Sequence, residues 1–453
     1  MLRSLVLCSV VAAMAACGTG GTNLPREAGF GPSPTLPEPH AQAIPLVHIA
    51  PARAWRGDET PTAARGFQVT AFARGLDHPR WLYVLPNGEV LVAETNAPAE
   101  RTEEHKGLRN WFMGLVMKDA GAGVPSPDRI TLLRDRDGDG VAEMRTTFLS
   151  GLHSPYGMTL VGNTLYIADS DALVRVPYHN GETRISATPE RVIDLPAGSR
   201  NHHWTKNVIA SRDGRHLYVA VGSNSNVGEH GMAIEAERAA IWEVDPVART
   251  HRVFASGIRN PSGMDWNPQT GALWTVVNER DEIGNDLVPD YMTHVQDGAF
   301  YGWPYSYYGQ HVDIRPQPPR PDLVARATVP DYALGAHTAS LGLAFARGAM
   351  MPAHYRNGAF VGQHGSWNRA ELNGYRVIFV PFANGMPSGP PEDVLTGFVD
   401  AQGYARGRPV GVVFDKRGGL LVADDVGNSV WRVGAAPMQH PVVASNAESH
   451  AGR

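Results

Sequence analysis

The sequence predicts an all-β protein, a six-bladed β-propeller, and three observations carry this prediction. One pattern recurs six times: a polar loop, a short apolar strand, a turn and a second apolar strand. The 49 glycines and 35 prolines favour short strands and turns over long helices. With 43% hydrophobic residues, the chain can fill a large core. Such units close into a ring of small sheets, whereas a β-sandwich would not explain six copies.

The repeats define the predicted blades in order. They cover residues 75–95, 151–177, 202–224, 257–279, 337–365 and 407–433. Turn signals such as PNG, RDG and KRGG separate the apolar runs. The predicted propeller domain therefore spans residues 62–436, and residues 437–453 form a C-terminal tail.

The first 17 residues are typical of a lipoprotein-type signal peptide. One positive charge at Arg3 precedes an apolar run that is too short to span a membrane. Ala15, Ala16 and Cys17 followed by Gly18 resemble a lipoprotein cleavage site, with a plain cleaved signal as the alternative. Residues 18–61 are rich in Gly, Pro, Thr and Ala, which predicts a flexible linker. We therefore expect a periplasmic protein with a lipid anchor.

Charge and cysteine content exclude several classes of function. The formal net charge of -5 gives no reason to expect nucleic acid as a partner. Cys8 and Cys17 are the only cysteines, and both lie in the leader. The predicted propeller therefore has no thiol for a disulfide, a metal site or a nucleophile.

The loop at residues 256–268 carries the first candidate site residues, Arg259 and Asn260. It precedes an apolar run that reads as a buried strand. A surface ion pair for Arg259 is the simpler alternative. In a propeller, however, the loops that enter the inner strands meet at one mouth of the channel. The fold would thus bring His203, Thr338 and Arg408 close to Arg259.

Four motifs give this chain a resemblance to a known family. GIRNPSG, NHHWTKN, HTASLG and ARGRPVG resemble those of the quinoprotein sugar dehydrogenases. These are the soluble aldose dehydrogenase type, which binds pyrroloquinoline quinone (PQQ) with calcium. YGWPYSYYGQ and the insertion GLRNWFMGLVMKDAGAG are most similar to the L-sorbosone dehydrogenase branch. The resemblance covers about residues 66–433.

The resemblance implies roles for individual residues. His203 matches the base that takes the proton of the substrate hydroxyl, a task that suits the ordinary pKa of imidazole. Arg259 and Asn260 match a pair that contacts the quinone carbonyls. Arg406 and Arg408 match two arginines that hold the cofactor carboxylates, for which the guanidinium fork is suited. The alternatives are a turn-capping or packing histidine at 203 and a solvated basic turn at 406–408.

The resemblance also implies two further contacts with the cofactor, on blade 5. Thr338 matches a threonine that bonds a cofactor carboxylate. The family also uses a lysine near the fifth blade, where this chain has GQHGSWNRAELNG without a lysine. Arg369 is the nearest cation there.

The resemblance also implies a calcium ion held after the fourth-blade strand, largely by backbone carbonyls. The corresponding loop is NERDEIGNDLVPD, residues 278–290, which lacks the Gly-Pro pair of the relatives. Its candidate ligands are Glu279, Arg280, Asp281 and Asp286. An acidic surface loop is the alternative. DRDGDGVAE, residues 135–143, resembles the start of a second calcium loop, but a hairpin turn is favoured because Thr146 stands where a glutamate is needed.

The implied function is PQQ- and calcium-dependent oxidation of a sugar aldehyde or aldose at C1. The implied partners are a small sugar substrate and a respiratory electron acceptor, either a cytochrome or a quinone. A calcium-dependent lactonase is one alternative, although the arginines at the loops favour an anionic cofactor. A non-catalytic carbohydrate-binding propeller is another, because fold does not fix function.

Overall fold

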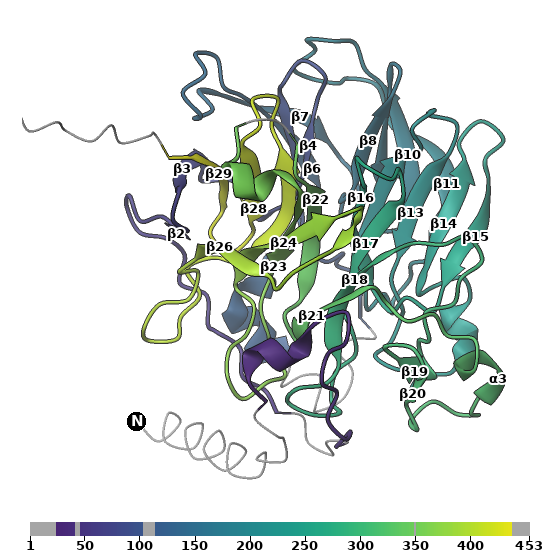
Figure 1. Ribbon diagram of the computed structural model, residues 1–453. Helices are drawn as coiled ribbons and strands as arrows, with labels where there is room; N and C mark the ends of the chain where they lie inside the picture. Colours follow the sequence, from purple (N-terminus) through teal and green to yellow (C-terminus); the bar gives the residue numbers. More distant parts are fainter. Residues whose placement is uncertain (1–23, 41–45, 103–113, 348–349, 437–453) are drawn as a thin grey trace, which may run out of the picture.

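The computed structural model describes residues 24–40, 46–102, 114–347 and 350–436 (Figure 1). The predicted signal peptide, the predicted tail and residues 107–113 of the insertion lie outside the described residues. Within the described ranges, no helix is both long and apolar enough to cross a membrane.

Six antiparallel sheets of the same topology follow one another along the chain, which confirms the six-bladed propeller. Blades 1 to 3 are β4 (Pro79–Val84), β5 (Val90–Glu94), β6 (Arg129–Arg134), β7 (Met144–Ser150); β8 (Met158–Val161), β9 (Thr164–Ala168), β10 (Ala172–Pro177), β11 (Glu190–Asp194); β12 (Lys206–Ala210), β13 (Leu217–Val221), β14 (Ala240–Asp245), β15 (Thr250–Ser256). Blades 4 to 6 are β16 (Pro261–Trp266), β17 (Leu273–Val277), β18 (Pro289–His294), β21 (Tyr332–Ala336); β22 (Ser340–Phe345), β23 (Gly358–Gln363), β24 (Arg376–Ala383), β26 (Glu392–Thr396); β27 (Pro409–Phe414), β28 (Leu420–Asp424), β29 (Ser429–Ala435), β3 (Phe67–Arg74).

The ring closes in blade 6, where strands from opposite ends of the chain pair. β3 lies antiparallel to β29, from Ser429 opposite Arg74 to Ala435 opposite Phe67. The first strands of the blades, β4, β8, β12, β16, β22 and β27, are neighbours around the centre. They line the channel, and their order predicts that the loops before them share one rim.

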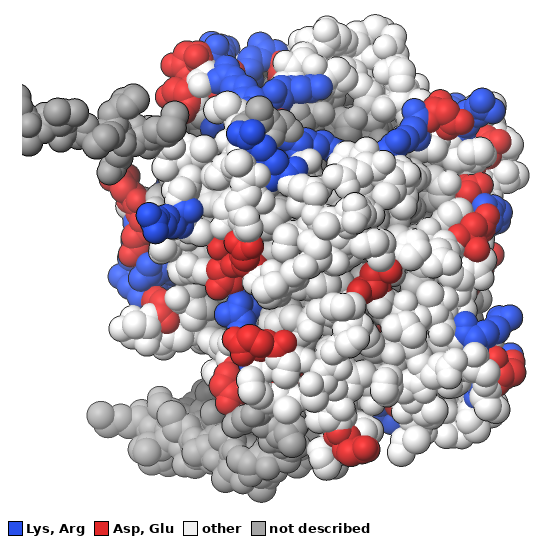
Figure 2. Space-filling model, in the orientation of Figure 1, with Lys and Arg blue, Asp and Glu red and all other residues white. Residues whose placement is uncertain are grey.

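Apolar side chains pack between adjacent blades. The middle strands β5, β17 and β28 are buried along their whole length. Because they are covered on both faces, apolar residues follow one another without alternation over most of each strand, as in LLVA of β28. Figure 2 shows acidic and basic side chains interspersed on one face of the molecule, with broad uncharged areas between them.

Short elements decorate the ring. They are η1 (Arg26–Gly29), β1 (Phe30–Gly31), β2 (Thr62–Ala63), η3 (Lys118–Ala122), η4 (Met232–Glu235), β19 (Ser306–Tyr307), β20 (His311–Val312), α3 (Pro321–Val324), η5 (Ala353–Arg356) and β25 (Met386–Pro387). β1 pairs with β21 and β2 pairs with β26. The described part of the segment expected to be a flexible linker, residues 18–61, therefore adds the strand β1 to blade 4, as the purple chain beside β21 shows in Figure 1. β2, at the start of the predicted propeller domain, adds a strand to blade 5.

Candidate active site

Loops from blades 3 to 6 meet at one rim of the channel, as the propeller predicted. A Cβ on Gly222 would lie 2.5 Å from both Asn260 Oδ1 and His203 Cβ, so the third and fourth blades touch there. The Gly365 amide donates to the Thr338 carbonyl at 3.0 Å, which joins two loops of blade 5. The fold thus brings together segments separated by about half of the chain.

His203 is held as a neutral imidazole with one defined free nitrogen. Its Nδ1 lies 2.9 Å from the Ser223 carbonyl oxygen, which only accepts hydrogen bonds, so Nδ1 carries the proton. The Ser223 hydroxyl, 3.0 Å from Nδ1, donates its own proton to the Ser225 carbonyl. Burial and the nearby charge of Arg259 hold the pKa of His203 well below 6.5. Nε2 therefore has a lone pair at neutral pH and can act as a base.

Lys206 fixes the loop that carries His203. It is fully buried, and its Nζ lies 3.2 Å from the carbonyl oxygens of both His203 and Trp204. Burial lowers its pKa well below the usual value for lysine. Sequence reasoning did not single out this residue, although it stands in the NHHWTKN motif.

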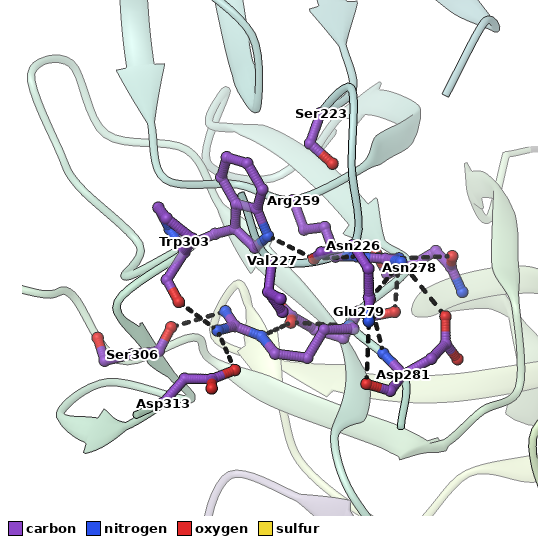
Figure 3. Close-up of polar contacts among 12 residues, drawn as sticks. Ser223, Asn226, Val227, Arg259, Asn278, Glu279, Asp281, Trp303, Ser306 and Asp313 are labelled. Atoms are coloured by element: carbon purple, nitrogen blue, oxygen red, sulfur yellow. Dashed lines mark hydrogen bonds and ion pairs between the residues drawn. The ribbon is translucent and has the colours of Figure 1, made fainter. Parts of the chain in front are cut away.

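Arg259 is fully hydrogen-bonded to neighbouring loops (Figure 3). Its guanidinium donates to the side chain of Asn226 at 2.9 Å, to the carbonyl of Glu279 at 2.6 Å and to Asn278 at 3.3 Å. It also pairs with Asp281 at 3.2 Å, and only 1% of its side chain is exposed. The predicted direct contact with a quinone carbonyl would require one of these bonds to be exchanged. As the structure stands, its charge acts on His203 through space.

Asn260 and the arginines 406 and 408 keep hydrogen-bonding capacity. Asn260 Oδ1 and Arg408 Nε are buried and have no hydrogen-bond partner among the residues described. Arg408 is 2% exposed and makes no ion pair with a carboxylate of the described chain. Arg406 lies over the ring of Trp55, with its guanidinium carbon 5.9 Å from the ring centre. Buried charges and polar atoms normally find partners, so the two guanidinium groups indicate an anionic ligand and Asn260 Oδ1 indicates a polar one.

The structure places Thr338 and Arg369 in supporting positions. Thr338 is fully buried, and its hydroxyl donates to Asp290 at 2.8 Å. Arg369 donates to Asp286 and to the Asn285 carbonyl, both at 2.7 Å. Both side chains tie rim loops to one another, and Arg369 Nε is buried without a hydrogen-bond partner among the described residues. Their contact with the cofactor stays a prediction.

The predicted calcium ligands do not converge on one point. Glu279 pairs with Arg280 at 3.0 Å, and Asp286 pairs with Arg369. Asp281 pairs with Arg259 and, at 3.1 Å, with His337. In the structure the carboxylates of Glu279, Asp281 and Asp286 are thus engaged in ion pairs with arginine or histidine. Glu279, Arg280, Asp281 and Asp286 as calcium ligands stay a prediction.

One acidic group elsewhere has ligand-like spacing. Asp135, Asp137, Asp139 and Glu143 have oxygens within 4.8 Å of one another, and within the described ranges no other set of three or more acidic or histidine side chains does so. Asp135 accepts the amides of Gly138 and Gly140 at 2.6 and 3.1 Å. These bonds form the turn before β7 that the sequence favoured.

His364 and Asp425 form a second histidine site that sequence reasoning missed. His364 Nε2 and Arg80 Nη1 each lie 2.9 Å from Asp425 Oδ2, and His78 Nε2 lies 3.6 Å from it. Burial opposes ionisation, but these three groups hold the pKa of Asp425 far below its usual value. The ionised carboxylate therefore accepts from Nε2, which leaves Nδ1 of His364 as a proton acceptor.

Position along the blades was the signal for this pair. His364 directly follows β23, and Asp425 directly follows β28. In an antiparallel blade, the loop that leaves the second strand lies beside the loop that enters the first. Polar residues just after the second strand of a blade therefore indicate the rim as well as polar residues just before the first strand do.

His78 makes the rim sensitive to acid. Burial lowers its pKa to about 4, although Asp425 opposes the shift. Between pH 6.5 and 4 an unfolded chain takes up a proton at this histidine while the folded chain does not, so acidification favours unfolding. This pKa shift corresponds to a loss of about 3 kcal/mol in the free energy of unfolding between pH 6.5 and pH 4.

When the pH is lowered from 6.5 to 4, the free energy of unfolding of the parent falls. We expect that of His78→Asn to fall by about 3 kcal/mol less. Asparagine is chosen because the backbone φ of His78 is 54°, a region that asparagine tolerates. Denaturant titrations at a series of pH values measure the effect. Identical pH dependence in the two proteins would contradict it.

The free groups of the rim fit an anion that carries carboxylates and further polar atoms. Arg406 and Arg408 offer charged donors for carboxylates, and Asn260 offers an amide beside His203. PQQ has these features, so the residues present fit this cofactor.

Comparisons with known proteins agree with this chemistry. The family model described as Glucose / Sorbosone dehydrogenase matches residues 164–373, and the model described as TrAA12-like matches residues 320–436. The chain is 30% identical over 288 residues to an aldose sugar dehydrogenase of Escherichia coli K12, covering 59% of this chain and 67% of that one.

A PQQ-dependent pyranose dehydrogenase of Coprinopsis cinerea is 24% identical over 445 residues, covering 84% of this chain but only 55% of the fungal protein. The holo form of the PQQ domain of Coprinopsis cinerea pyranose dehydrogenase superimposes with a TM-score of 0.66 at 21% identity, covering 85% of this chain and all of that domain. The structural likeness supports the propeller fold. Together with the sequence identity to the Escherichia coli enzyme, these findings show that the chain belongs to the PQQ-dependent aldose sugar dehydrogenase family.

Proposed function

We propose that this protein is a sugar dehydrogenase that oxidises an aldose or a sugar aldehyde at C1, with PQQ as its resident cofactor. The observation that carries the proposal is a neutral histidine base, His203, together with the buried Arg408, which has no carboxylate partner among the described residues. When bound, PQQ supplies a quinone that accepts the two electrons and the hydrogen released at C1.

The protein residues divide the work of binding and proton transfer. His203 Nε2 takes the proton of the C1 hydroxyl, since Nδ1 is already committed to Ser223. Burial, together with the nearby charge of Arg259, lowers the pKa of this imidazole and keeps it neutral before the reaction. Arg406 and Arg408 bind the cofactor carboxylates. A sugar aldehyde enters the same reaction as its hydrate, which carries a C1 hydroxyl.

We further propose a preferred substrate, a metal ion, an electron acceptor and a cellular location. L-sorbosone is proposed as a substrate because of the YGWPYSYYGQ stretch and the insertion after residue 106. Calcium is proposed as the second component, with backbone carbonyls of residues 278–290 as ligands. A respiratory cytochrome or quinone is proposed as the electron acceptor. A lipid anchor at Cys17 in the periplasm is proposed because the leader is typical of a lipoprotein signal peptide.

Reconstitution tests the proposed function. Metal-stripped protein is assayed for dye-linked oxidation of L-sorbosone and a panel of aldoses, with PQQ and calcium added singly and together. We expect turnover only with both additions, and quinone absorbance that stays with the protein through gel filtration. Absence of both turnover and retained quinone would refute the proposal. Faster oxidation of aldoses than of L-sorbosone would refute only the preferred substrate.

A further inference from the structure

A segment near the N-terminus lies directly beside the two arginines proposed to bind the cofactor. The segment, residues 48–55, is called the strap. Ala52 forms a parallel bridge with Ala405, the Arg53 amide donates to the Ala405 carbonyl at 2.7 Å, and the Ala405 amide donates to Pro51 at 2.8 Å. These bonds attach the strap to the loop that leads into Arg406 and Arg408.

The strap is covered on its other side. The Ala52 amide donates to the Asp119 carbonyl at 2.9 Å, and a Cβ on Gly121 would lie 3.4 Å from Ala52 and 2.9 Å from Val426. Ala50 is fully buried. The strap is therefore packed between η3 and blade 6, and it is not a loose end of the chain.

One peptide of the strap contacts the buried guanidinium of Arg408. Arg408 Nη2 donates to the Ala50 carbonyl at 2.9 Å, and its guanidinium carbon lies 4.7 Å from the ring centre of Tyr375. The Tyr375 hydroxyl is in turn 3.3 Å from the Ala50 amide. Ala50 and Tyr375 thus fix the direction of this guanidinium and leave its Nε without a protein partner.

Trp55 connects the strap to the second arginine. Its indole Nε1 donates to Asp424 Oδ2 at 2.7 Å, while Asp424 Oδ1 accepts the backbone amide of Arg408 at 2.7 Å. The same indole ring lies under the guanidinium of Arg406. A cation over a tryptophan face is stabilised and oriented without any of its N–H groups being used.

We propose that the strap is a built part of the cofactor site, in which Trp55 and Ala50 position the Arg406 and Arg408 side chains for an anionic ligand. The inference rests on the proposed function, because it assigns the occupant of this pocket as the PQQ carboxylates. The strap lies outside the residues matched by either family model. Trp55 is a positioning residue, since it acts through Arg406 and Asp424.

Two variants separate the contacts of Trp55. Trp55→Phe keeps an aromatic face for Arg406 but removes the indole donor to Asp424, and Trp55→Leu removes both. The matched control is Trp266→Phe, which removes an indole bond of 2.8 Å to the Ala210 carbonyl on another blade. All four proteins are titrated with PQQ by equilibrium dialysis in the presence of calcium, and folding is checked by circular dichroism.

We expect PQQ to bind about tenfold more weakly to Trp55→Phe and about a hundredfold more weakly to Trp55→Leu, while Trp266→Phe binds as the parent does. At saturating PQQ the KM for sugar should be unchanged in all four. If the parent binds PQQ but both Trp55 variants match the control, the strap inference fails and the proposed function stands. If sugar KM rises while PQQ binding is unchanged, the strap serves the substrate and the inference also fails. If the parent binds no PQQ, the proposed function itself fails.

Discussion

His203→Gln is expected to lower kcat by about 10²- to 10⁴-fold, the range that a positioned general base contributes. The cause is the loss of Nε2, the nitrogen that hydrogen bonding to Ser223 leaves free. PQQ binding should be nearly unchanged, because the arginines proposed to hold the cofactor lie on another blade. Dye-linked kinetics at saturating sugar and PQQ measure the loss of turnover, and dialysis measures the binding.

The pH profile distinguishes a base from a merely structural histidine. The pKa of His203 is held well below 6.5, so kcat should fall only on acidification well below that pH. Removing the positive charge with Arg259→Met should raise this pKa and move the acid limb upward. His179→Gln, a change of an exposed histidine paired with Glu182, is the control. An unchanged acid limb in Arg259→Met, or full activity in His203→Gln, would contradict the assignment.

Arg408→Met is expected to weaken PQQ binding by about a hundredfold or more, because charge-assisted bonds to a carboxylate are lost. The cofactor-free protein should lose only about 1–3 kcal/mol of unfolding free energy, because the buried Ala50 carbonyl loses its donor while methionine replaces the packing of the arginine stem. Dialysis and denaturant titration measure the two effects separately.

Arg432→Met is the matched control on the same blade. Arg432 pairs with Asp415 at 2.6 Å, away from the rim. Its loss should reduce stability and leave PQQ binding unchanged. If Arg408→Met instead only lowers the unfolding free energy and binds PQQ as tightly as the parent does, Arg408 is a structural residue.

The fold could be predicted from the sequence because each blade repeats the same local pattern. A polar loop, an apolar strand and a turn such as PNG specify one hairpin without reference to the rest of the chain. The positions of His203 and Asn260 followed from that pattern, since both precede first strands. Local sequence therefore located the rim.

The partners of the rim side chains could not be predicted in the same way. Arg369 and Asp286 are separated by 83 residues, and their ion pair depends on two irregular loops. The strap has no apolar periodicity, and its order comes from contacts with residues about 350 positions away, such as Ala405. A Pro- and Ala-rich segment with this composition reads as a tether unless its distant partners are known.

The pairing of β3 with β29 can form only after nearly the whole propeller has been synthesised. Phe67–Arg74 leaves the ribosome early, but its neighbour Ser429–Ala435 is synthesised about 350 residues later. At roughly 5–20 residues per second, synthesis of the intervening chain takes on the order of 20–70 s. Throughout this time β3 is an unpaired edge strand, the kind of segment that associates with other chains. It is the segment for which a holding chaperone has the longest opportunity to bind.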